Sequence, residues 1–564
     1  MKMRKAAFAA FVLLASGVAS FAGPDTPKPD GQGPRTMDEA IDRVITNENR
    51  LYGSIKNYSP LVETYIQNLK PDKDLGYVPA GDKYFLGRAD FSKGVNLVSL
   101  SDTDGKGKKI FSSIGNFFTF AMQYLPDGFL QMIFIDTNGF DKQHYKFDYV
   151  QREFLGEVRC LVFDVTPLAK SGKGRFAGRI WVEDQGFNVV RFNGSYNGGG
   201  HSSWYFNFDS WRSNVQQGVW LPTFIYSEEK DLHYALSKKL DFKAQTRLWG
   251  YNLGHSSQEQ ELSKILVESP ANDETTTAND LSPIQAQRSW DRQAEDNVVD
   301  RLQRIGLIAP KGEVDKVLET VVNNLEVTNN IDVEPDVRCR VMTTSTLESY
   351  TIGHTIVLSR GLVDVLPDEA SLAAMLAHEL SHVVLGHRLD SQYAFFNELL
   401  VEDKDTFRHF GFARTPDEEK AANTKAIQIL NNSPYKAQLG NAGLFLQALQ
   451  NRQKEVPNLI SAHLGNRVPT MPDLQATTPV DPKLNPQKIA ALPIGGRVKM
   501  DPWNDKLELI KSKPVGTVAE REKMPFEVTP FMPYLTRFGT DATVKPIGAS
   551  TAADAKPSDA TPKP

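Results

Sequence analysis

Two histidines and a glutamate in residues 371–387, SLAAMLAHELSHVVLGH, have the types and the spacing of a metal-dependent hydrolase. His378, Glu379 and His382 form the pattern H-E-x-x-H. On a helix, residues four apart lie on one face, so both imidazoles can bind one ion. Glu379 lies at the adjoining edge, where it can deprotonate a water held by that ion. The pattern therefore predicts a zinc site with Glu379 as a catalytic residue.

The residues around this motif are almost wholly apolar, which indicates a helix buried on most sides. The alternative is a chance match on an ordinary exposed helix face. An apolar helix argues against that alternative, because unpaired ionisable groups are costly to bury.

A catalytic zinc needs three protein ligands and one open position, so the motif is incomplete by itself. His387 is the nearest candidate, but on a continuing helix it lies about 140° round from His382. We therefore expect His387 to be a structural, hydrogen-bonding histidine. The remaining possibility is a glutamate on a later helix.

Residues 412–430, FARTPDEEKAANTKAIQIL, resemble the F-S-R-x-x-E-x-E-A-D segment of the HtpX-like and BepA-like gluzincin zinc metallopeptidases. Two further segments are similar to segments of that family. They are residues 355–387 (TIVLSRGLVDVLPDEASLAAMLAHELSHVVLGH) and 459–467 (LISAHLGNR). The resemblance covers about residues 312–470. It implies that Glu419 is the third zinc ligand, with Glu418 as the fallback. It also implies that His463 approaches the metal and is a catalytic residue.

Two departures from the family pattern bear on this site. Ala421 stands where the family places an aspartate two residues after the ligand glutamate, and such neighbours orient ligands. Leu464 stands where the family has proline. For Glu418 and Glu419 the alternative is an exposed helix N-terminus, where acidic side chains offset the helix dipole.

The N-terminus predicts export. Lys2, Arg4 and Lys5 precede an apolar run over residues 6–19, and small residues precede a cut before Gly23. Residues 1–22 are thus expected to be a cleaved signal peptide, with an N-terminal membrane anchor as the alternative. Lipid attachment is not expected, since no cysteine follows the run. No later run of 18 apolar residues occurs, so we expect a periplasmic or secreted protein without a transmembrane segment.

The 564 residues suffice for two or three domains. The net charge of −5 comes without a basic stripe, so nucleic acid is not an expected partner. The two cysteines, Cys160 and Cys339, fall in different expected domains, which makes a bond between them possible but not favoured. The fold class expected is multidomain α+β, a curved antiparallel β half-barrel followed by a mainly helical zincin domain with a small sheet.

The expected domain boundaries follow changes of composition. Residues 23–36 are a Pro/Gly-rich flexible leader, 37–262 a β-rich domain, 263–284 a linker and 285–470 the zinc metallopeptidase domain. Residues 471–540 are an irregular Pro-rich segment expected to pack on the catalytic domain, and 541–564 a disordered tail. Helical spacing predicts a helix over 37–54, and residues 110–125 a helix or loop in the half-barrel. β-branched and aromatic runs predict strands at LVETYIQNL, DKYFLGRADF, FLQMIFID, VRCLVFDVTPL, RFAGRIWVED, GFNVVRFNGSY, SSWYFNFDSWR and VWLPTFIYSEE.

The leading helix, the run of strands and phrases such as GVWLPTFIYSEE are similar to the LolA-like half-barrels of Gram-negative envelopes. That resemblance covers about residues 37–250. It implies an apolar cavity for lipid or lipoprotein acyl chains. A β-rich interaction domain with a packed interior is the alternative.

The expected function is an exported zinc endopeptidase that hydrolyses envelope or misfolded polypeptides. Its nucleophile is a zinc-bound water that Glu379 activates. Residues 355–359 resemble the zincin edge strand, onto which an extended substrate could pair. The alternative function is a lipid- or lipoprotein-binding envelope quality-control factor with a weakly active or inactive zincin scaffold.

Overall fold

The computed structural model describes thirteen stretches of the chain. They are residues 34, 36–73, 76–92, 94–100, 124–197, 206–235, 238–251, 283–387, 412–469, 471, 498–500, 507–509 and 535–538. The predicted signal peptide, the C-terminal tail, the segment 110–123 and almost all of the leader and the linker lie outside these ranges. Among the described helices, none is long and apolar enough to cross a membrane.

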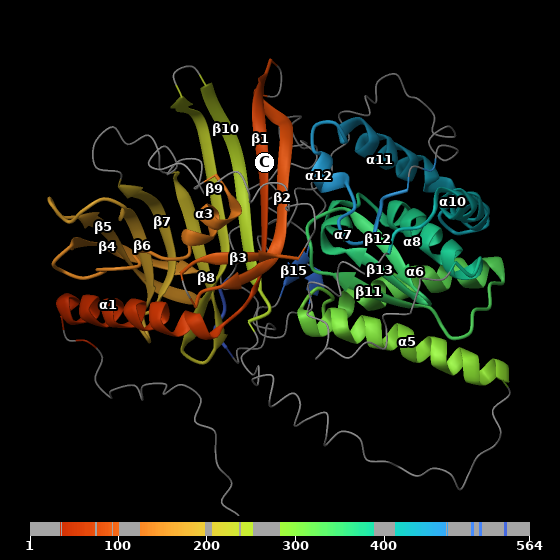
Figure 1. The fold of residues 1–564 in the computed structure, drawn as a ribbon, viewed down its shortest axis with the longest axis horizontal. Coiled ribbons are helices and arrows are strands. Elements are labelled where there is room, and N and C mark those ends of the chain that lie inside the picture. Colours follow the sequence, from red (N-terminus) through yellow and green to blue (C-terminus); the bar gives the residue numbers. More distant parts are fainter. Residues whose placement is uncertain are drawn as a thin grey trace, which may run out of the picture.

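In the described residues, the N-terminal region is one open antiparallel sheet of ten strands (Figure 1). Its strands follow one another as neighbours, except that β1 pairs with β10 and so joins the first three strands to the last seven. The spatial order is β3 (Asn96–Ser99), β2 (Gly76–Asp90), β1 (Leu61–Asp72), β10 (Lys238–Trp249), β9 (Val219–Ala235), β8 (Phe208–Gln216), β7 (Val189–Asn197), β6 (Arg175–Glu183), β5 (Val158–Pro167) and β4 (Tyr145–Leu155). The predicted β half-barrel fold class is confirmed.

Two helices lie against this sheet. Figure 1 shows α1 (Met37–Ser54) crossing one end of the strands, and α3 (Pro126–Gln131) packs with them in one apolar core. Thr36 caps α1 by accepting a bond from the Glu39 amide. Glu48 of α1 makes a bidentate ion pair with Arg212 of β8, and both side chains are buried. This pair fixes α1 on the sheet by a charge-assisted contact as well as by apolar packing.

The aromatic side chains inside the sheet pack on one another. Phe129, Phe206 and Phe242 are nearly fully buried, with ring centroids 4.9–5.9 Å apart. Among the residues the structure places, this part of the inner face is therefore a packed core.

One predicted strand was wrong. FLQMIFID lies in α3 and the turns after it, because Pro126 occupies the first helical turn. Its apolar residues are buried in either structure, and a short apolar run does not distinguish a strand from a helix. Strands β3, β4 and β10 were not predicted.

The second region surrounds a small sheet with helices. Two long helices lead into it, α5 (Pro283–Ile305) and α6 (Glu313–Asn329), with Pro310 between them. The sheet has the order β11 (Arg338–Met342), β13 (Thr355–Ser359), β12 (Glu348–Ile352), β14 (Asn466–Arg467). The remaining helices are α7 (Arg360–Val365), α8 (Glu369–Val384), α10 (Pro416–Asn431), α11 (Leu439–Arg452) and α12 (Pro457–Ile460).

The strand expected to be a free edge is not one. β13 pairs in parallel with β11 on one side and antiparallel with β12 on the other. Its five residues are all buried. No substrate can add to β13 by backbone pairing, so that expectation was wrong.

A buried carboxylate of the large sheet fastens it to the helical region. Glu63 of β1 is 1% exposed, and its carboxylate accepts bonds from the Ser345 amide (2.6 Å) and the Ser345 hydroxyl (2.7 Å). Arg247 of β10 lies 3.0 Å from the same carboxylate. Because Ser345 leads into β12, this contact ties the large sheet to the small one.

A second carboxylate does the same one strand away. Asp82 of β2 accepts bonds from the Asn458 amide (2.9 Å) and the Leu459 amide (2.8 Å) at the start of α12. Tyr65 of β1 donates to the same carboxylate at 3.0 Å. The Asp82 contact therefore fixes the segment that precedes His463.

The C-terminal residues touch both regions. β15 (Val498–Met500) packs near α7, and β16 (Leu507–Leu509) packs on α6. Further on, the Leu535 carbonyl accepts a bond from the Glu157 amide, and Arg537 pairs with Glu183, both on the large sheet. The described part of this segment thus contacts the N-terminal sheet as well as the helical region.

Candidate metal centre

The helix α8 carries the H-E-x-x-H motif in the interior of the helical region. Asp368 caps it by accepting a bond from the Ser371 amide at 2.8 Å. The alanine, leucine and methionine residues that follow favour a helix. His378, Glu379 and His382 are each at most 1% exposed. Their spacing has its predicted effect, since the Nε2 atoms of the two histidines lie 3.2 Å apart.

The helix α10 brings a carboxylate to these nitrogens. Glu419 Oε2 lies 3.2 Å from His378 Nε2, and Glu419 Oε1 lies 3.6 Å from His382 Nε2. These three residues each place one potential ligand atom within 4.8 Å of the other two. The structure therefore brings together the three residues that the sequence predicted as ligands.

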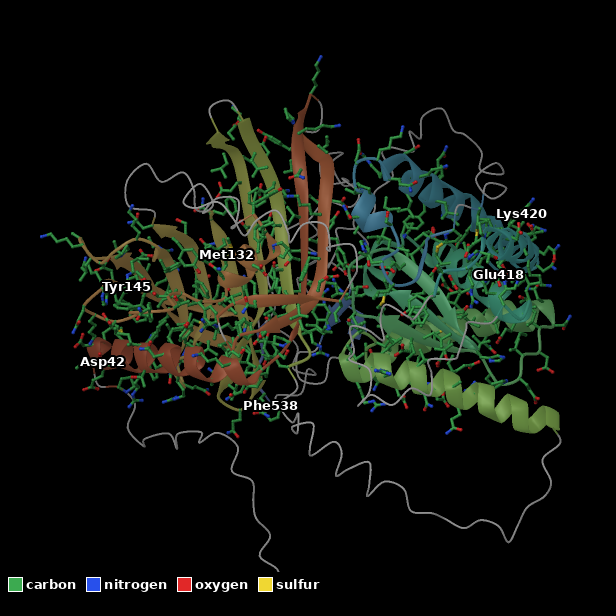
Figure 2. The ribbon with its side chains drawn as sticks, in the orientation of Figure 1. Asp42, Met132, Tyr145, Glu418, Lys420 and Phe538 are labelled. Carbon is green, nitrogen blue, oxygen red and sulfur yellow. The ribbon has the colours of Figure 1, made fainter. Side chains whose placement is uncertain are left out.

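The neighbouring Glu418 has a different role at the start of α10. Its carboxylate accepts bonds from the Thr415 amide (3.0 Å) and the Thr415 hydroxyl (2.9 Å), which completes a capping box. Figure 2 shows Glu418 with Lys420 at the outer side of the helical region. The capping contact favours Glu419 over the fallback Glu418 as the third ligand.

The donor set fits a zinc ion. Two imidazole nitrogens and one carboxylate are the protein ligands of one common class of catalytic zinc site. Burial, with His378 and Arg414 nearby, lowers the pKa of His382 to about 2, so its imidazole is neutral and can bind a metal. Glu419 Oε1 is buried and, within the described structure, has no hydrogen-bond partner. A cation between these groups would satisfy that oxygen and both facing nitrogens.

Glu379 is oriented by a residue that the sequence did not single out. The Ser349 hydroxyl of β12 donates to Glu379 Oε1 at 2.6 Å. Burial raises the pKa of Glu379, while His378 and the Ser349 bond act in the opposite direction. Two residues along the same strand, Thr351 Oγ1 accepts a 2.7 Å bond from Arg414. The available signal was the alternation of polar Ser349 and Thr351 in a short strand, but that strand was not predicted.

His387 lies beside the site because the helix does not continue. α8 ends at Val384, and Gly386 takes a φ of +70°, which is readily adopted by glycine. This turn lets the His387 amide donate to the His382 carbonyl at 3.0 Å and places the two Nδ1 atoms 2.9 Å apart. The expectation of a hydrogen-bonding histidine holds, but the angle computed for a continuing helix does not apply.

His463 is not in the ligand group. Its Nε2 lies 2.7 Å from the Asn458 carbonyl oxygen, and its ring packs on Tyr84 of β2 with centroids 4.5 Å apart. Asn458 lies in the segment that is bonded to Asp82, and Tyr84 lies two residues after Asp82 in β2. A catalytic part for His463 remains a prediction.

The residue at 421 faces away from the metal site. Ala421 is exposed on α10, and residues two apart on a helix do not share a face. An aspartate at this position would point to solvent. Its replacement by Ala421 therefore gives no reason to expect a weaker site.

Comparison with known proteins finds a family match within the helical region. Residues 310–439 match the model of peptidase family M48. No curated protein sequence matches the chain. Two similar solved structures are a putative outer membrane lipoprotein-sorting protein domain from Vibrio parahaemolyticus and a DUF1329 family protein from Desulfovibrio piger. The first is 9% identical, with a TM-score of 0.20, and covers 41% of this chain and 99% of its own. The second is 10% identical, with a TM-score of 0.20, and covers 39% and 94%.

The matched segment spans α6, the strands β11 to β13, α7, the motif helix α8 and the whole of α10, which carries Glu419. It therefore contains all three predicted ligands and Glu379. Residues 310–439 belong to peptidase family M48, a family of metallopeptidases.

Proposed function

We propose that this protein is a zinc-dependent endopeptidase that hydrolyses polypeptides outside the cytoplasm. The observation that supports it most is the group of His378, His382 and Glu419 around one point, with Glu379 fixed next to it. We propose His378 Nε2, His382 Nε2 and the Glu419 carboxylate as the zinc ligands. A zinc ion held there would polarise a peptide carbonyl and lower the pKa of a water to near neutrality.

Glu379 is the proposed general base. Its Oε1 is bonded to Ser349, whereas Oε2 is buried and has no partner among the described groups. Oε2 is therefore the atom that accepts the proton of the attacking water. The same atom then passes the proton to the leaving amine. The buried surroundings favour this return, because they disfavour the charged carboxylate and so help it hold a proton between the two steps.

The proposed location and substrate rest on the sequence. The charged start at Lys2, Arg4 and Lys5 and the apolar run after it support export to the periplasm or the medium. Envelope or misfolded polypeptides are then the substrates available. Lipid binding by the large sheet is not favoured, because the described aromatic side chains on its inner face pack against each other.

The test is cleavage of unfolded casein by the zinc-loaded protein and by Glu379→Gln. We expect the variant to keep its zinc and to lose cleavage, since the amide cannot accept the proton. A chelator should abolish cleavage by the parent, and added zinc should restore it. Equal cleavage by Glu379→Gln would remove Glu379 as the base. Absence of metal-dependent cleavage by the zinc-loaded parent would refute the proposed function.

A further inference from the structure

Ser349 contacts the proposed base from a strand outside the motif helix. Its side chain is fully buried, and its hydroxyl donates to Glu379 Oε1 at 2.6 Å. A bond of this length to a carboxylate is of the strong, charge-assisted kind. The hydroxyl proton of Ser349 is therefore held in a hydrogen bond to one oxygen of Glu379.

The strand that carries this hydroxyl is held on both sides. Ser349 pairs with Leu358 of β13 and with Asn466 of β14. The preceding residue, Glu348, accepts bonds from the Leu464 and Gly465 amides, each at 2.8 Å, and so clamps β14 onto β12. Because its backbone is fixed in this way, Ser349 can orient a neighbour rather than follow it.

The bond makes the two oxygens of Glu379 unequal. Oε1 accepts from Ser349, while Oε2 is buried and meets no hydrogen-bond partner in the part of the chain that the structure describes. A carboxylate without this contact could rotate about its last torsion, which is broad for a glutamate. With it, one oxygen is kept for proton transfer in a fixed direction.

We propose that Ser349 is a positioning residue for proton transfer by Glu379, an inference that rests on the function proposed above. Ser349 is not a member of the ligand group, and its hydroxyl bonds to Glu379. Its hydroxyl holds Oε1, so that Oε2 faces the reacting water throughout the cycle. Loss of the hydroxyl then slows the chemical step and leaves zinc and substrate binding intact.

The test compares Ser349→Ala with Ser349→Thr, which keeps a hydroxyl and suits a strand. Thr344→Val is the matched control, because the Thr344 hydroxyl is also buried nearby but has no partner among the described groups. Zinc content, thermal midpoint, kcat and KM are measured for each. Removing a group that orients a reacting residue costs roughly 10- to 100-fold.

We expect Ser349→Ala to lose that factor in kcat with zinc content and KM close to the parent. Ser349→Thr should recover most of the loss, and Thr344→Val should match the parent. A parental kcat in Ser349→Ala would overturn the proposal. So would an equal kcat loss in Thr344→Val, which would make the effect one of packing.

Crystal structures of the zinc-loaded parent and Ser349→Ala separate this proposal from the function on which it rests. We expect Glu379 Oε1 on Ser349 in the parent and a turned or split carboxylate in the variant. An unchanged Glu379 in the variant refutes the positioning role, whether or not peptides are cleaved. An inactive loaded parent with a turned carboxylate in the variant refutes the function alone.

Discussion

The assignment of Glu419 over Glu418 can be tested with two neighbouring substitutions of the same chemistry. Glu419→Gln removes the negative charge that lies 3.2 Å from His378 Nε2, while shape and volume stay almost the same. Glu418→Gln makes the same change one residue earlier, in a carboxylate that caps α10. The two variants therefore separate metal binding from the effect of a negative charge at the start of α10.

The expected magnitude follows from the number of ligands. Structural zinc sites with four ligands bind with apparent free energies of about 10–16 kcal/mol, or about 3 kcal/mol for each ligand. At 1.4 kcal/mol for each factor of ten, Glu419→Gln should weaken zinc binding by roughly 10²-fold. Glu418→Gln should leave zinc affinity unchanged and lower the free energy of unfolding by about 0.3–1 kcal/mol, because the amide oxygen still accepts the capping-box bonds and only the charge at the helix N-terminus is lost.

The assay is a zinc titration in competition with a chelator of known affinity, together with urea unfolding of the metal-free proteins. Weaker zinc binding in Glu418→Gln, with parental affinity in Glu419→Gln, would refute the assignment. Equal losses of zinc affinity in both variants would mean that the conformation of the start of α10, and not one ligand, determines zinc binding.

Three further predictions concern contacts around the site and in its framework. His387→Ala should weaken zinc binding roughly 10- to 100-fold in the same titration, because the His387 ring orients His382 through Nδ1; unchanged affinity would make that contact incidental. Asp82→Asn should lower the free energy of unfolding by about 1–3 kcal/mol in urea, since an amide leaves one backbone donor such as that of Asn458 without an acceptor; a stability equal to the parent's would contradict it. Burial raises the pKa of Glu326 to about 7 from 4.5, so the folded chain holds this proton to higher pH than the unfolded chain, and stability falls as pH rises through that range. Glu326→Gln should therefore reduce the fall of the urea midpoint between pH 5 and pH 8. An unchanged dependence of the midpoint on pH would refute Glu326 as its cause.

The sequence predicted the metal helix well because its signal is local. The spacing of His378 and His382 determines that both imidazoles share a face, whatever the helix packs against. Glu419 was predicted from family register. The structure adds the physical reason for it, since Glu418 is engaged in the capping box with Thr415.

The remaining parts depend on contacts between distant segments. Ser349 is thirty residues from Glu379 and comes from a strand whose five residues are all buried. Its alternation is too short to predict from sequence alone. The interior place of β13 depends on β11 and β12 pairing on either side of it, which strand propensity does not encode. His387 was misplaced because the turn at Gly386 was not foreseen.

Anomalous diffraction at the zinc edge from crystals of the zinc-loaded Glu379→Gln variant would locate the metal and name its ligands. We expect one zinc ion bound by His378 Nε2, His382 Nε2 and the Glu419 carboxylate, in a protein that no longer cleaves casein. No zinc at this point, or a zinc ion bound by other residues, would contradict it.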